Sequence, residues 1–123
     1  MKIRYVLVSI LGMSLLMGGC AQPPADQINA AEQAVKDAQQ NGAATYVAND
    51  YAKVEGLLAA MKTEVAEQDG KFALFRDYGK AEQLAATTKA EAERVKTDAA
   101  KKMEEAKSAA AQAYQAAQAT VAS

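Results

Sequence analysis

The C-terminal half of the chain contains a long stretch without a strong helix breaker, and this feature constrains the fold more than any other. From Phe72 to about Ala119 the sequence is rich in Ala, Lys, Glu and Gln, and Gly79 is its one soft point. These four residue types have high helix propensity, so we predict a single long helix. At 1.5 Å per residue this helix is roughly 70 Å long. Part of it must therefore extend beyond any small bundle or pair with another molecule.

A first, shorter helix is predicted from Gln27 to Asn41. Asp26 fits its N-cap, and Gly42 fits the residue that ends it. Its small and apolar residues recur at helical spacing; they are Ile28, Ala31, Ala34, Val35 and Ala38.

A second helix is predicted to begin at a cap provided by Thr45 or Asn49 and to run to about Gln68. Asp69-Gly70 then gives a tight turn. One face of this helix carries most of its apolar residues; they are Tyr51, Val54, Leu57, Leu58, Met61 and Val65.

Together the three segments predict an all-α fold, a short up-down-up helical bundle with a long Ala-rich C-terminal helix. The second helix is only about 35 Å long, so the bundle can cover the third helix only to about Arg94. We therefore assign residues 27–94 to the bundle and residues 95–123 to a coiled-coil-like helical arm.

The long helix also carries alanines with a strict seven-residue period. Such a period is typical of a coiled-coil seam that lets two helices approach closely. The alternative is that alanine serves only helix propensity in an Ala-rich stretch. On the first interpretation the arm binds a second copy or an envelope protein; the alanines are Ala85, Ala92, Ala99, Ala106 and Ala113.

The N-terminus has the parts of a secretory signal in order. Lys2 and Arg4 precede an apolar run from Val6 to Met17, and Gly18 and Gly19 follow. The run is shorter than the roughly 20 apolar residues that a transmembrane helix needs. We predict a signal-peptide helix over residues 1–19, cleaved between Gly19 and the next residue, Cys20.

The segment Leu15-Leu16-Met17-Gly18-Gly19-Cys20 resembles the lipobox of bacterial lipoproteins. The resemblance implies that Cys20 accepts a diacylglyceryl group and a further acyl chain such as palmitate. Met17 departs from the usual Leu, and the alternative is an incidental thiol behind an ordinary signal. Several acyl chains hold a protein firmly on a membrane. In a Gram-negative host, Ala21 after the cysteine implies sorting to the outer membrane, periplasmic face.

Residues 20–26 are predicted to form a lipidated tether, because Pro23 and Pro24 favour an extended chain. The sequence beyond the predicted leader has 12 basic and 15 acidic residues, since Lys2 and Arg4 of the 14 basic residues lie within the leader. This mildly acidic balance argues against nucleic-acid binding. The chain has no His and a single Cys. We predict no metal site, no cofactor and no enzymatic activity.

Four short motifs are similar to those of a family of small bacterial lipoproteins whose shared domain is catalogued as domain of unknown function 4398. The similarity covers about residues 25–90 and implies a helical fold without indicating a chemistry. Ala48 departs from it, because relatives commonly place a proline there. The motifs are Ala30-Ala31-Glu32-Gln33-Ala34, Asn41-Gly42-Ala43-Ala44-Thr45-Tyr46, Gly70-Lys71-Phe72 and Ala81-Glu82-Gln83-Leu84-Ala85.

Five aromatic residues concentrate around the second helix and the turn that follows it. Aromatic residues at such spacing are usually core or loop anchors, and the alternative is a groove that receives a glycan, a peptide or another small ligand. They are Tyr46, Tyr51, Phe72, Phe75 and Tyr78. The leading hypothesis is a lipid-anchored envelope protein with a structural or protein-interaction role, and the alternatives are a ligand-binding module at these aromatics and a surface-exposed adhesin.

Overall fold

The computed structural model describes residues 22–122, and the fold of this part is all-α, as predicted. The predicted signal helix, the cleavage site at Gly19 and the lipidation site at Cys20 lie outside the described residues. The described part contains no β-strand. Its elements are α2 (Ala25–Gln40), α3 (Ala43–Tyr46), α4 (Ala48–Asp69), the 3₁₀ turn η1 (Ala73–Phe75) and α5 (Gly79–Ala122).

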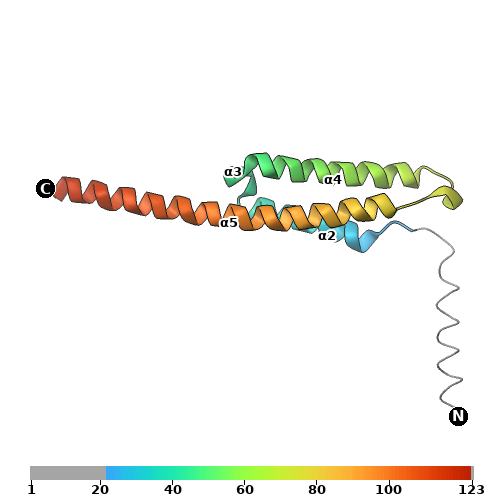
Figure 1. Cartoon of the computed structure of the whole chain (residues 1–123), viewed down its shortest axis with the longest axis horizontal. Coiled ribbons are helices and arrows are strands. Elements are labelled where there is room, and N and C mark those ends of the chain that lie inside the picture. The colour runs from blue at the N-terminus through green and yellow to red at the C-terminus, as the bar shows by residue number, and fades with distance from the viewer. Residues whose placement is uncertain (1–21, 123) are drawn as a thin grey trace, which may run out of the picture.

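The long helix α5 is the central element of an up-down-up bundle (Figure 1). The helices α2 and α5 run in the same direction, and α4 runs opposite to both. Each of α2 and α4 packs more extensively against α5 than against the other. The beginnings of α2 and α5 therefore lie at one end of the bundle, and the C-terminal part of α5 leaves at the other.

The seven-residue alanine repeat of α5 forms the inner face of the bundle. Ala85, Ala92 and Ala99 are buried, and so are Thr88 and Val95 between them. The small side chains let α2 and α4 lie close to α5. The buried hydroxyl of Thr88 donates a hydrogen bond of 2.6 Å to the carbonyl oxygen of Leu84, so that burying it leaves no unpaired polar group.

The covered part of α5 reaches Ala99, about one turn beyond the predicted limit at Arg94. The cause is a turn at Gly42, whose φ of 84° lies in the left-handed region. This turn leads into α3, and Ala43 and Val47 pack in the same buried cluster as Ala99. The prediction placed residues 95–99 in the arm because it did not include α3.

Beyond Ala99 the helix continues as a single arm. Met103 is half-buried, and all residues from Glu104 to Ala122 are exposed. Residues 100–122 span about 34 Å at 1.5 Å per residue. The arm is helical, and it begins about five residues later than predicted.

The helix starts differ from the predicted caps. Pro24, not Asp26, occupies the N-cap of α2, and Asp26 lies in the first turn. The N-cap of α4 is Val47, and no side-chain hydrogen bond caps this helix, so neither Thr45 nor Asn49 has the predicted role. Thr45 belongs to α3.

The third helix begins at Gly79 and not at Phe72, so Gly79 is its first residue and not a kink within it. The side chain of Asp77 accepts a hydrogen bond of 2.9 Å from the Gly79 amide. The Asp77 amide in turn donates to Oε1 of Gln68, at 2.9 Å. These contacts with the end of α4 fix a separate connection of residues 70–78, which helix propensity alone does not anticipate.

Candidate functional site

The five predicted aromatic residues lie at opposite ends of the bundle. Tyr46 and Tyr51 lie on α3 and at the start of α4, whereas the others lie in the connection that follows α4. Even Tyr51, the nearer of the first two, is separated from the connection by 18 residues of α4, or about 27 Å of helix. The five aromatic residues are close in the sequence, but a straight helix lies between the first two and the last three. The prediction of one groove formed by all five is therefore wrong.

The individual aromatic residues have different roles. Tyr51 and Tyr78 are buried, and Tyr46 packs half-buried against the core. These three agree with the interpretation of aromatics as core anchors. Phe72 and Phe75 are exposed, so that interpretation fails for them.

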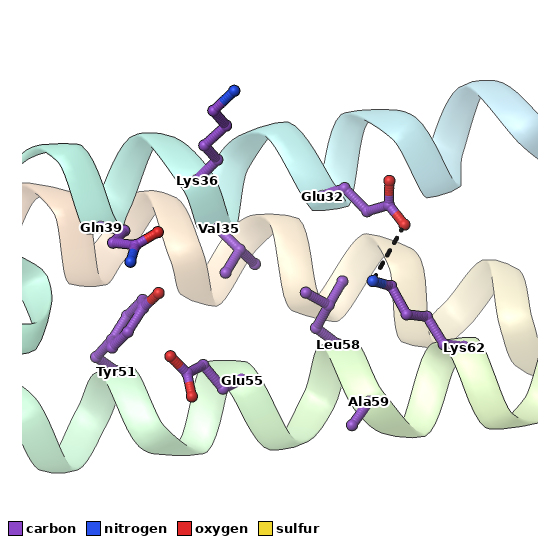
Figure 2. A pocket seen from close by; sticks show the side chains of 9 residues that line it. All are labelled: Glu32, Val35, Lys36, Gln39, Tyr51, Glu55, Leu58, Ala59 and Lys62. Carbon is purple, nitrogen blue, oxygen red and sulfur yellow. Dashed lines mark ion pairs between the residues drawn. The ribbon is translucent and has the colours of Figure 1, made fainter.

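An open groove lies between α2 and α4, with α5 behind it (Figure 2). Its volume is about 480 Å³. Val35 and Leu58 give it an apolar centre, and Tyr51 is the one predicted aromatic that lines it. The remaining lining residues are Glu32, Lys36, Gln39, Glu55, Ala59 and Lys62.

Polar groups surround this apolar centre. Nζ of Lys62 lies 3.5 Å from Oε1 of Glu32 and bridges the groove. Both side chains are about half exposed, so this ion pair contributes at most about 1 kcal/mol. Lys36 points away from the groove in Figure 2.

The phenol of Tyr51 in this groove has a raised pKa. Burial raises the pKa of Tyr51, and hydrogen bonding to Glu55 and the charge of that carboxylate raise it further. The hydroxyl thus stays protonated at neutral pH and acts as a hydrogen-bond donor. A protonated phenol beside carboxylates and amines gives this groove polar groups that can form hydrogen bonds with a ligand.

A second polar cluster joins the end of α4 to the start of α5. Nε2 of Gln68 donates to Oε1 of Glu64 at 3.0 Å, and Nζ of Lys80 lies 3.4 Å from the other carboxylate oxygen. Glu64 and Gln68 are buried. The hydrogen bond from Gln68 is the main cause that lowers the pKa of Glu64, with Lys80 acting in the same direction and burial opposing both. This cluster stabilises the connection.

The connection is held by further hydrogen bonds to its backbone. The guanidinium of Arg76 donates from Nε to the Lys71 carbonyl at 2.8 Å and from Nη2 to the Asp69 carbonyl at 3.0 Å. The hydroxyl of Tyr78 donates to Oδ1 of Asp69. This hydrogen bond, together with burial, raises the pKa of Tyr78.

Sequence reasoning missed that this connection presents apolar side chains to solvent. Leu74 is exposed together with Phe72 and Phe75. The available signal was the run Phe-Ala-Leu-Phe between Lys71 and Arg76. Helix propensity places this run inside the long helix and therefore does not predict an exposed apolar turn with Leu74.

Of the repeat alanines, the last four, from Ala92 to Ala113, are the predicted interaction residues, and they are divided between two environments. Ala92 and Ala99 are buried within the bundle, so they are not available to another molecule. Ala106 and Ala113 are exposed on the arm. Near the end of the arm, Tyr114 and Val121 add exposed apolar surface, and the Tyr114 hydroxyl accepts a hydrogen bond from Gln118.

Within residues 22–122, no group of three or more His, Cys, Asp or Glu residues is placed to hold a metal ion. In the same part of the chain, no helix combines the length and the apolar character needed to cross a membrane. None of the family models, curated proteins or solved structures compared with the chain matches it. The similarity to the lipoprotein family described above stays a prediction.

Proposed function

We propose that this protein is a lipid-anchored component of the cell envelope, held at the periplasmic face of the outer membrane by an acylated Cys20. The protein has a structural role, or it mediates a protein interaction through the arm. The support for the anchor is in the sequence, where the single Cys follows an apolar run and two glycines. The bundle begins at Ala25, only a few residues later.

One structural observation carries the proposed role: the arm and the N-terminal tether leave the bundle at opposite ends (Figure 1). Because α2 and α5 run in the same direction, a chain anchored before α2 directs the end of α5 away from the anchor. The 44 residues of α5 span about 66 Å. An anchored molecule would therefore present its arm well away from the lipid surface.

The anchor is tested by metabolic labelling with palmitate and by membrane fractionation. The parent protein is expected to take up label and to sediment with membranes, whereas Cys20→Ser is expected to lose the label. Met17→Leu restores the more usual lipobox residue and is the matched control, with labelling retained. If Cys20→Ser is labelled and sediments like the parent, the proposed anchor is wrong.

The proposed interaction surface is the exposed continuation of the alanine repeat, Ala106 and Ala113. A second helix packed against these residues has no room for a large charged side chain. Ala106→Glu combined with Ala113→Glu is expected to remove cross-linking of the arm to a second copy or to another envelope protein. Lys107→Glu, which changes charge beside the stripe, is the control. Equal cross-linking in all variants contradicts this role for the arm.

A second candidate function is ligand binding in the groove between α2 and α4. The observation that favours it is the protonated Tyr51 hydroxyl beside the apolar surface of Val35 and Leu58. The groove is open along one side, whereas typical small-molecule sites enclose most of the ligand surface. Tyr51→Phe is expected to abolish any thermal shift caused by soluble glycan fragments. The absence of a shift with the parent protein rejects this candidate.

A further inference from the structure

The connection between α4 and α5 exposes a compact set of large apolar side chains. Phe72, Leu74 and Phe75 are 85%, 92% and 73% exposed. Among the described residues only Tyr114 and Val121, at the end of the arm, are comparable large apolar side chains in solvent. Three such side chains within four residues form an apolar tip that the protein's own core does not use.

The tip is part of an ordered turn and not a loose segment. The amide of Phe75 donates to the carbonyl of Phe72 at 2.8 Å, which closes η1. Arg76 spans the turn with its two hydrogen bonds to the carbonyls of Lys71 and Asp69. Next to the tip, Tyr78 is buried and anchored to Asp69. The fold therefore holds the three side chains outward while it fixes the backbone beneath them.

The tip lies at the end of the bundle where the tether enters (Figure 1). Ala31 of α2 and Ala85 of α5 belong to one buried cluster. Because these helices run in the same direction, moving back along both from this pair brings Pro24 to about the level of Tyr78. The apolar tip and Pro24, which follows the proposed lipid anchor by four residues in the sequence, thus share one end of the described part of the chain.

Basic residues flank the tip. Lys71 precedes Phe72, and Arg76 follows Phe75. Arg76 uses two of its five N–H donors on backbone carbonyls. The two nearby carboxylates, Asp69 and Asp77, accept hydrogen bonds from the Tyr78 hydroxyl and the Gly79 amide. Apolar side chains between cations match a lipid surface, where acyl chains lie below phosphate groups.

We propose that Phe72, Leu74 and Phe75 insert into the lipid leaflet that holds the acyl chains of Cys20, with Lys71 and Arg76 at the level of the phosphates. This inference rests on the proposed lipid anchor. The insertion gives the bundle a second membrane contact beside its tether, so that the arm stands away from the surface. Without the insertion, the tether is the only proposed link between the bundle and the membrane.

The chain has no Trp, so a single introduced Trp reports its own surroundings. The test uses the lipidated full-length product in vesicles of phosphatidylethanolamine and phosphatidylglycerol that contain brominated phosphatidylcholine as a quencher. For Phe75→Trp we expect a blue-shifted emission and loss of most of the fluorescence to the quencher. The matched control is Tyr114→Trp, an exposed aromatic on the arm, for which we expect neither change.

The outcomes separate this inference from the anchor on which it rests. If the protein floats with the vesicles but Phe75→Trp is unquenched, the insertion is wrong and the anchor stands. If the emission is blue-shifted but insensitive to brominated lipid, the tip is covered by protein, for example by a second copy, and the insertion is again wrong. If the parent protein takes up no palmitate and does not float, the anchor fails, and the insertion fails with it.

An independent variant tests the same proposal without a reporter. Phe72→Ser, Leu74→Ser and Phe75→Ser together remove the apolar tip from side chains that are already exposed, so circular dichroism is expected to show an unchanged helix content. Lipidated protein with these changes is expected to stay on vesicles, while protease cleavage at Lys71 and Arg76 becomes faster than in the parent. Equal cleavage rates for parent and variant on vesicles contradict insertion.

Discussion

Replacing Ala92 with Leu tests whether the alanine repeat packs within the bundle. Ala92 is fully buried and shares one cluster with Ala34, Ala38 and Val54. Leu adds three carbon atoms at a position where small side chains let the helices lie close together. Overpacking of this kind costs about 1 to 3 kcal/mol.

The arm provides a matched control for this substitution. Ala113 occupies the same position of the seven-residue repeat and is exposed. Ala and Leu have nearly equal helix propensity, so the two substitutions differ mainly in packing. We expect Ala113→Leu to change the free energy of unfolding by no more than about 0.5 kcal/mol.

Thermal unfolding followed by circular dichroism measures the difference. In a domain of this size 1 kcal/mol corresponds to a shift of about 4 to 8 °C in Tm, so Ala92→Leu is expected to lower Tm by at least about 4 °C. Urea denaturation gives the matching change in free energy. If Ala92→Leu raises Tm, the seam has room for larger side chains, and the close packing described for α5 is wrong. Equal effects of the two substitutions would also contradict it.

Two further predictions concern the turn at Gly42 and the contact of Tyr78. Gly42→Ala places a Cβ on a left-handed residue, 3.0 Å from Cδ2 of Tyr46, so it should lower the free energy of unfolding by about 1 to 2 kcal/mol. In the control Gly56→Ala the new Cβ meets no atom within 4 Å, and this substitution should stabilise α4 by about 0.5 to 1 kcal/mol. Urea denaturation that ranks the two variants in the opposite order refutes the left-handed turn at Gly42. The pKa of Tyr78 is raised from its ordinary value of 10.0 by its hydrogen bond to Asp69 and by burial, so its contribution is present below pH 10 and is lost as the pH rises through the folded-state pKa. The free energy of unfolding of Tyr78→Phe should therefore fall less steeply than that of the parent as the pH rises above about 10. Identical alkaline unfolding curves of parent and variant would show that this contact does not stabilise the fold.

The sequence was sufficient to predict the three long helices, though not α3, because the signals of long helices are local. Helix propensity predicted α5, and Gly42 was correctly expected to end α2. The burial of Ala85, Ala92 and Ala99 follows from the seven-residue period. The same period could not say where burial stops, because Ala106 repeats the pattern without a covering helix.

The features that were missed depend on contacts between residues distant in the sequence. The limit of the bundle at Ala99 depends on its packing with Val47. The start of α5 at Gly79 depends on hydrogen bonds that join Asp77 to Gln68 of α4. Leu74 lies in the connection and not in α5. Helical periodicity, which assigns a residue to the buried or the exposed face of a helix, therefore does not predict its exposure.

The central claim is that the tether and the arm leave the bundle at opposite ends, so that an anchored molecule holds its arm away from the membrane. Resonance energy transfer to an acceptor lipid tests it most directly, with a donor dye on a thiol introduced at Gln22 or at Ala122 of the lipidated protein. The length of α5, about 66 Å, predicts strong transfer from residue 22 and little from residue 122. Equal transfer from both positions would place the arm along the lipid surface and contradict the claim.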